Sequence, residues 1–274
     1  MSKTKKQSGQ AIGDALRSWF TVGVILVAAA ISILVFIYVM GNPVFFEGGN
    51  REGRVLGGNY LAIIYKGGWV VPLLMTVLLV LFTFSIERAI TLVRARGKGR
   101  INVFVKNLQT QLDNNEIDEA IEACDKQKGS LANVMKAGLL RYKALQADTT
   151  LEKDQKILAL QKEFEEASAL ELPILSRNLV ILSTIASISV LIGLMGTVLG
   201  MIRAFKALAQ AGAPDALALA TGISEALINT AFGIAGSLLA IVLYNFFSTQ
   251  IDSFTYKIDE AGFSLVQSFA AKNK

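Results

Sequence analysis

Four long stretches of the chain consist almost entirely of apolar residues, and the charged residues gather between them. Residues 18–46 are 29 positions without a charge, 67–86 are 20, 178–202 are 25, and 216–251 are 36 with a single charge. A helix that crosses a bilayer needs roughly 20 predominantly apolar residues, so each stretch is long enough. The pattern predicts an all-α, polytopic membrane protein with four transmembrane helices, and it excludes a single soluble core.

Between the second and third apolar stretches, the pattern becomes that of amphipathic helices. Apolar residues recur at three- and four-residue steps over 101–113, 116–127 and 131–147. The same spacing starts again near 151 and runs through a charged segment towards the third apolar stretch. We therefore expect a helical domain outside the membrane, whose last helix leads directly into a membrane helix.

The ends of these amphipathic helices carry recognisable signals. Asn115, Ser130 and Thr149 are expected to be N-caps, because their side chains can accept hydrogen bonds from the first backbone N–H groups. Thr149 and Glu152 have the spacing of a capping box. Pro173 is expected to kink the last helix, since proline removes a backbone donor.

The distribution of basic residues predicts the orientation. The second apolar stretch is followed at once by five of them: Arg88, Arg94, Arg96, Lys98 and Arg100. Such residues stay on the cytoplasmic side, so we expect both termini and 88–177 in the cytoplasm and 41–66 outside, with an amphipathic surface segment at 55–65. The first apolar stretch is longer than a signal-peptide core and lacks a small-residue cleavage site, which favours an uncleaved helix.

These observations divide the chain into successive segments. They are a basic cytoplasmic tail (1–18), an extra N-terminal transmembrane helix (19–40), a periplasmic segment (41–66), a transmembrane helix (67–87), a helical cytoplasmic domain (88–177), a transmembrane helix (178–203), a periplasmic turn (204–215), a transmembrane helix (216–250) and a cytoplasmic C-terminal tail (251–274).

The residue inventory excludes several kinds of chemistry. The sequence contains no histidine and one cysteine, Cys124, so it cannot form an intrachain disulfide or supply a His/Cys zinc cluster. Histidine-based acid–base catalysis is also excluded. Residues 97–100, GKGR, lack the spacing of a phosphate-binding P-loop. We expect no metal, no cofactor and no enzymatic activity.

Nucleic-acid binding is not expected either. Residues 87–177 contain 15 basic and 14 acidic residues, which leaves almost no net attraction for a polyanion.

The third membrane helix carries small residues on one side, including Gly193, Gly196 and Gly200, and the fourth carries Gly233. Small residues at four-residue spacing let another helix approach closely. That helix can belong to the same chain or to a second copy. We expect a homo-oligomer with the third and fourth helices in its inner ring.

The fourth helix also holds Glu225, with Asn229 one turn further on. An ionisable group in a membrane helix typically faces the protein interior or a water-filled path for ions. Because this helix is long, Glu225 can instead lie near the outer boundary, where a carboxylate costs little. A single carboxylate does not form a relay across a bilayer, so a proton path would need a titratable group from a partner.

Two segments resemble the signatures of a known family. Residues 193–202, GLMGTVLGMI, and 222–233, GISEALINTAFG, are similar to the two membrane motifs of the ExbB/TolQ proton-channel family. Tyr244 and Asn245 are expected to close the fourth helix as in that family, and Glu87–Arg88 resembles the inner end of its preceding helix. The resemblance covers roughly 67–250 and is most like ExbB.

The resemblance implies a motor subunit in the bacterial inner membrane, driven by the proton motive force. It implies a homopentamer whose pore encloses the single-span helices of a dimeric ExbD-like partner, which energise a TonB-like or Tol-like system. An aspartate of that partner would carry the proton. Thr197 and Thr230 match the pore-lining threonines of the family, and Glu225 matches its pore glutamate.

Three features depart from the family pattern. Val190 and Leu239 stand at positions where the family often has proline, and the helix at 19–40 is additional. A flagellar or gliding stator of the MotA type also has four helices, although it usually lacks an equivalent of Glu225. A structural helical membrane scaffold is the alternative of another class, since it would need the glycines but not Glu225 or Thr230.

Overall fold

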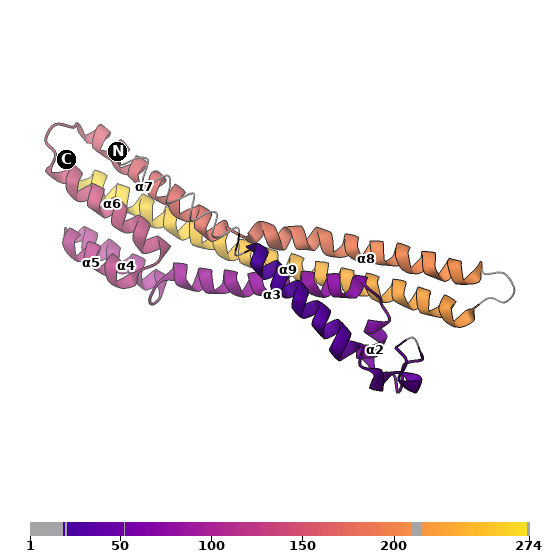
Figure 1. Ribbon diagram of the computed structural model, residues 1–274. Coiled ribbons are helices and arrows are strands. Elements are labelled where there is room, and N and C mark those ends of the chain that lie inside the picture. Colours follow the sequence, from indigo (N-terminus) through magenta and orange to yellow (C-terminus); the bar gives the residue numbers. More distant parts are fainter. Residues whose placement is uncertain (1–18, 20, 52, 210–214, 273–274) are drawn as a thin grey trace, which may run out of the picture. The chain divides into compact units, whose positions relative to one another are not determined.

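The chain is predominantly helical in the part that the computed structural model describes, which is residues 19, 21–51, 53–209 and 215–272 (Figure 1). These residues form no β-strand, and they contain one isolated bridge, between Phe46 and Val55. Four helices in the described part are long and apolar enough to cross a membrane. The prediction of an all-α protein with four such helices is confirmed.

The chain divides into two compact units, which interleave along the sequence. The first comprises residues 1–85 and 181–243, and the second comprises 86–180 and 244–274. The first unit therefore contains most of the apolar length, and the second contains the amphipathic helices. The predicted basic tail, 1–18, lies outside the described residues.

In the first unit, an aromatic cluster joins the first helix to the start of α3. The first helix spans Thr21–Met40, and its last six residues, Val35–Met40, widen into the π-helix η1. Phe36 stacks on Tyr65 with ring centroids 4.6 Å apart and also contacts Trp69. Helix α3 spans Val70–Arg96. The buried Phe36 ring thus supplies apolar contact where the chain enters α3.

The segment between these two helices is only briefly helical. It contains two 3₁₀ turns, η2 (Pro43–Phe45) and η3 (Glu47–Gly49), and the short helix α2 (Tyr60–Tyr65). The Asn59 side chain caps α2 by accepting from the N–H of Leu61 at 2.9 Å. The predicted amphipathic stretch 55–65 is thus helical over its second half only.

The last two membrane helices, α8 (Leu179–Leu208) and α9 (Ala216–Lys272), run side by side in opposite directions within the first unit (Figure 1). The predicted turn 204–215 is corrected at its start, because α8 continues to Leu208, whereas α9 begins at Ala216, as expected; residues 210–214 lie outside the described residues. Asp215 begins α9 by accepting from the N–H groups of Leu217 and Ala218, both at 3.0 Å.

In the second unit, four amphipathic helices pack with the C-terminal half of α9. They are α4 (Ile101–Asp113), α5 (Ile117–Gln127), α6 (Ser130–Ala147) and α7 (Lys153–Ser176). The Tyr142 ring of α6 meets the Phe269 ring of α9 edge to face, with centroids 4.7 Å apart. Helix α9 therefore does not end at Tyr244–Asn245, and the predicted tail 251–274 is helical to Lys272.

The helix ends differ from the predicted N-caps. Asn115 has φ +66 and ends α4: its N–H bonds Leu112 O, and the next N–H bonds Gln111 O. This is the Schellman arrangement, which favours asparagine or glycine in the left-handed region. Ser130 is the first residue of α6 rather than its cap.

The capping box of α7 is formed by Glu152 and Gln155, not by Thr149 and Glu152. Pro173 lies inside α7, and the chain leaves the helix only at Arg177–Asn178, where Asn178 has φ +60. The interruption before α8 is therefore displaced by one turn from the predicted kink.

Candidate functional site

Helices α8 and α9 approach each other through small residues. A Cβ added to Gly193 would lie 3.0 Å from the Cα of Gly233, and one added to Gly200 would lie 2.8 Å from the N of Ala226. A Cβ on Gly196 would overlap the Asn229 side chain. One turn after Gly233, the Ser237 hydroxyl donates to the backbone carbonyl of Ala186 at 2.5 Å. Close backbone approach of this kind is what small residues permit in membrane helices.

The glycine stripe is therefore used within one chain. The expectation that Gly193, Gly196, Gly200 and Gly233 hold subunits together loses its basis, because α9 of the same chain already occupies the space beside them. Of the two possibilities that the sequence left open, the structure supports packing inside the protomer.

The two candidate threonines lie at one level of this helix pair. Gly196 contacts Asn229, and Thr197 and Thr230 are the next residues on their respective helices. Successive residues of an α-helix are rotated by about 100°. In an antiparallel pair, residues that follow two facing positions turn towards the same side, because the helices wind in opposite senses when viewed from one end. Thr197 and Thr230 therefore lie on one side of the pair.

That side is not covered by the described part of the chain. The residues that share it, by the same spacing, are apolar, and more than a third of each is exposed: Leu194, Met201, Ile223, Leu227, Ile234 and Leu238. We call these six residues with Thr197 and Thr230 the threonine face. Leu227 reaches 65% exposure, although the other side of the same helix is buried.

The opposite side of α9 packs against the start of α3. Ile228 joins the cluster built by Phe36, Met40 and Val71, and the buried Asn229 amide donates to the Gly67 carbonyl at 2.9 Å. The threonine face is therefore the free side of a helix layer whose other side is anchored within the chain.

Both threonine hydroxyls bond to their own helix. The Thr197 hydroxyl donates to Leu194 O at 2.5 Å, and the Thr230 hydroxyl donates to Ala226 O at 3.2 Å. Each hydroxyl oxygen keeps lone pairs that can accept a further hydrogen bond. The threonine face thus presents two acceptors at one level within an apolar surface.

Glu225 lies on the anchored side, near the beginning of α9. Its side chain is 4% exposed and forms an ion pair with Arg203 of α8, whose side chain is 53% exposed. The carboxylate fills the space over Gly68, which has φ +73 and could not carry a Cβ without overlapping it. Glycine is suited to this position both by its backbone conformation and by the lack of a side chain.

The pair also forms part of an open cleft of about 920 Å³. Arg51, Lys66 and Asp215 line the same cleft. Glu225 is thus enclosed by α3, α8 and α9 of its own chain, whereas the resemblance implied a place on a pore wall. Its geometry is that of a group that holds three helix ends together.

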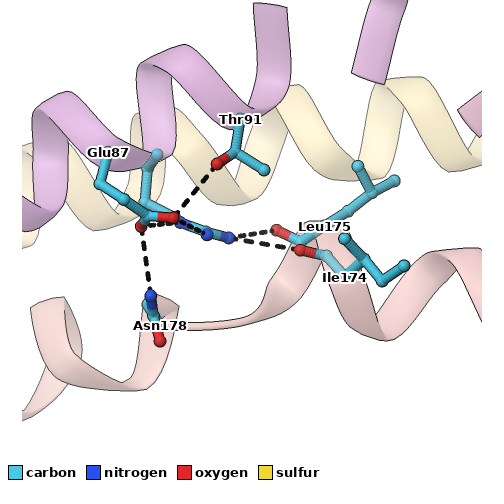
Figure 2. Close-up of polar contacts among 6 residues, drawn as sticks. Glu87, Thr91, Ile174, Leu175 and Asn178 are labelled. Carbon is cyan, nitrogen blue, oxygen red and sulfur yellow. Dashed lines mark hydrogen bonds and ion pairs between the residues drawn. The ribbon is translucent and has the colours of Figure 1, made fainter. Parts of the chain in front are cut away.

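A second polar cluster lies at the junction of α7 and α8, in the second unit (Figure 2). Arg88 of α3 is 2% exposed, and its guanidinium donates to the backbone carbonyls of Leu175 at 3.1 Å and Ile174 at 3.5 Å. These carbonyls belong to the last turn of α7, where a helix leaves its acceptors without internal partners. Arg88 therefore caps the C-terminus of α7.

Glu87 completes this cluster, which we call the junction clamp (Glu87, Arg88, Thr91, Asn178 and the carbonyls of Ile174 and Leu175). Its carboxylate accepts from both Nε and Nη2 of Arg88, at 2.8 and 2.5 Å, which is the bidentate geometry of strong pairs. It also accepts from Thr91 and from the Asn178 amide, each at 3.2 Å. The clamp thus fixes the position of Asn178, the residue with positive φ between α7 and α8.

Comparison with known proteins relates about half of the chain to one family. Residues 126–260 match the model of the MotA/TolQ/ExbB proton channel family. The chain carries a MotA/TolQ/ExbB family domain. The match extends from α5 into the C-terminal half of α9, and it includes both threonines, Glu225 and the glycines that pack α8 on α9.

Individual relatives carry the names ExbB and TolQ. The chain is 42% identical over 73 residues to the biopolymer transport protein ExbB of Salmonella typhimurium, which is 27% of this chain and 30% of that protein. It is 30% identical over 145 residues to ExbB of Pseudomonas putida (53% of this chain, 44% of that protein). It is 31% identical over 117 residues to the Tol-Pal system protein TolQ of Pseudomonas aeruginosa (43% and 51%). The matched part is less than two thirds of each relative.

Two residues of the MotA/TolQ/ExbB domain have roles that the sequence did not suggest. Arg203 is the last residue of the predicted third membrane helix, and its guanidinium meets the Glu225 carboxylate where α8 and α9 lie side by side. Asn178 begins the third apolar stretch, and its amide donates to Glu87, which is 91 positions away in the sequence. A search for opposite charges at the facing ends of the third and fourth membrane helices would have found Arg203. The sequence around Asn178 contains no signal that predicts its contact with Glu87.

The MotA/TolQ/ExbB domain offers no apparent metal centre. Among the residues that the structure describes, no group of three or more Asp, Glu or Cys side chains could hold a metal ion. Cys124 is buried in α5, and burial, together with the neighbouring Asp125, raises the pKa of its thiol to about 12. A thiol in this state is a packing residue rather than a nucleophile.

Proposed function

We propose that this protein is a channel subunit of an ExbB/TolQ-type motor that uses the proton motive force to energise an envelope system. The MotA/TolQ/ExbB domain and the names of its relatives support this class of function. The proposed setting is the bacterial inner membrane, with several passes and both termini in the cytoplasm. The role requires no enzymatic chemistry and no cofactor.

The threonine face is the observation that carries the proposal. An apolar surface that is uncovered in the chain and includes two hydroxyls at one level presents acceptors that lipid leaves unused and a partner's polar group can bond. Copies of the chain that turn this face inward would form a pore, with a ring of hydroxyls at one depth. Five copies around the single-span helices of an ExbD-like dimer are the assembly that the family resemblance implies.

The hydroxyls suit a partner carboxylate that alternates between two protonation states. When the carboxyl group is protonated, it can donate to Thr197 or Thr230 while the hydroxyl still bonds its own helix. When the carboxyl group is ionised, the hydroxyl can rotate and donate to it instead. In the low dielectric of a membrane interior, a carboxylate without such a donor is strongly disfavoured.

Glu225 takes a positioning role in this proposal. Because its carboxylate is enclosed by Arg203 and Gly68, it holds the outer ends of α3, α8 and α9 at fixed spacing. The threonines can lie at one level only if α8 and α9 keep their register. Loss of Glu225 would therefore affect the proton path through the position of α9.

The test is the removal of each hydroxyl without a change of shape. Thr197→Val and Thr230→Val should leave the assembly intact on a native gel and should abolish most energised uptake or client movement in cells. Thr76→Val is the matched control: its hydroxyl also bonds its own helix, donating to Pro72 O at 2.7 Å, but it belongs to α3. Activity of the control should stay close to that of the unmodified protein.

Full activity of both assembled valine variants would contradict the proposal. A scaffold role would then be the better explanation, since a scaffold needs the small residues between α8 and α9 but no hydroxyl on the free face.

A further inference from the structure

A cationic cleft lies in the second unit, where the loop between α3 and α4 meets the C-terminal half of α9. The cleft has a volume of about 500 Å³ and is lined by Arg96, Gly99, Arg100, Lys257 and six further residues, among which there is no carboxylate. Residues 97–100 lack the spacing of a P-loop, but two of them, Gly99 and Arg100, line this cleft.

Three positive charges surround the cleft, and none of them is neutralised by a neighbour. Among the described residues, no carboxylate lies within ion-pair distance of Arg96, Arg100 or Lys257. Arg96 uses one guanidinium nitrogen to bond the Gln250 amide oxygen, which holds its side chain at the rim. Three like charges around one cavity repel one another, and a bound anion would relieve that repulsion.

The other polar side chains that line the cleft can donate hydrogen bonds to a phosphate group. Asn102, Gln250 and Ser253 line the cleft, and α4 begins there with no side chain capping its first N–H groups. Guanidinium groups bind phosphate oxygens in pairs, and the free N–H groups of a helix start add further donors.

We propose that this cleft binds a phosphate group, which is either the headgroup phosphate of an anionic lipid or a free phosphate ester. Arg100 and Lys257 provide the charge, and Arg96 provides a preorganised donor at the rim. The cleft shares no residue with the threonine face, so this site is independent of the proposed proton path.

The experiment uses the purified full-length chain with two probes. In the first arm, thermal unfolding in detergent is followed as inorganic phosphate replaces chloride at constant ionic strength. In the second arm, native mass spectrometry counts phosphatidylglycerol retained by the chain after release from nanodiscs, with pure phosphatidylcholine nanodiscs as the reference. Stabilisation by phosphate assigns a free phosphate, and selective retention of phosphatidylglycerol assigns a lipid headgroup.

The double substitution Arg100→Gln and Lys257→Gln should weaken whichever probe binds by about tenfold or more, since each charged contact to phosphate is lost. Lys98→Gln removes the same charge from the same loop, but Lys98 does not line the cleft, so binding should stay within about twofold. Arg100 is exposed and Lys257 is half-buried, and the single variants provide the same comparison. Equal binding by the double variant and Lys98→Gln, or no binding of either probe, would overturn the proposal.

Discussion

At the scale of single residues, the pair of Glu225 and Arg203 combines an enclosed acceptor with a half-exposed donor. The carboxylate cannot reach solvent easily, whereas the guanidinium can. Removing one partner of a buried pair costs more than the pair itself contributes, because the remaining charge stays in a poorly solvated place. The two positions should therefore respond unequally to substitution.

Arg203→Gln is expected to lower the stability of the protein by about 1–3 kcal/mol, between the values for exposed and for fully buried pairs, because Arg203 is half exposed. Glu225→Gln should cost less, since an amide tolerates burial better than an unpaired carboxylate. The double variant should recover part of the loss caused by Arg203→Gln. Melting temperatures of the four proteins in detergent measure this coupling, and strictly additive losses would show that the pair is not coupled.

The buried Cys124 leads to a second prediction at this scale. With a thiol pKa raised to about 12, the thiolate that attacks a maleimide hardly forms below pH 9, whereas an exposed cysteine titrates near 8.5. We expect the folded protein to react at least about 100-fold more slowly than the protein unfolded in dodecyl sulfate. Fast labelling of the folded protein at pH 8 would show that α5 opens readily.

At the scale of elements, the amphipathic helices were predicted almost to the residue. The ranges 101–113, 117–127 and 130–147 follow directly from apolar positions at three- and four-residue steps, because those positions are the buried ones. The caps were predicted less well. Asn115 ends one helix instead of starting the next, and the choice depends on backbone conformation, which the residue type alone does not determine.

The C-terminal part of α9 could have been found by the same pattern. Its buried residues again recur at three- and four-residue steps: Phe254, Ile258, Ala261, Leu265 and Phe269. The prediction stopped at 250 because the hydropathy falls there, although a helix that leaves the membrane can continue as an amphipathic one. The threonine face was predicted only by resemblance, and its geometry required knowledge of how α8 packs on α9.

The junction clamp gives a prediction about the stability of one helix end. Arg88→Lys keeps the charge but cannot bind Glu87 with two nitrogens and the Ile174 and Leu175 carbonyls at the same time. We expect hydrogen exchange at the last turn of α7 and the start of α8 to become about tenfold faster or more, consistent with the loss of 1.5–3 kcal/mol for hydrogen bonds to a charged group.

Arg94→Lys serves as the comparison for this measurement, since Arg94 is an exposed residue of the same helix. Its exchange pattern should match that of the unmodified protein. If Arg88→Lys also leaves the α7 terminus protected, the backbone of the junction is stable without the clamp.

At the scale of the whole molecule, the membrane orientation is the prediction with the widest consequences. A cysteine at Asn50 should be labelled in intact cells by a reagent that does not cross the membrane, because 41–66 is expected outside. A cysteine at Glu119 should be labelled only after lysis. Glu119 is exposed and helical, which makes it a better site than Asn115 with its positive φ. The reverse labelling pattern would mean that all four membrane helices cross the membrane in the opposite direction.

The unbroken length of α9 has a mechanical consequence. Its 57 residues extend through both units without an interruption, whereas the path through α7 and α8 contains a joint at Arg177–Asn178. A straight helix of this size is a lever of about 85 Å, so a tilt of roughly ten degrees about one end displaces the other by about 15 Å. In the proposed motor, a change of tilt that begins beside Thr230 would therefore grow along α9 towards Lys272.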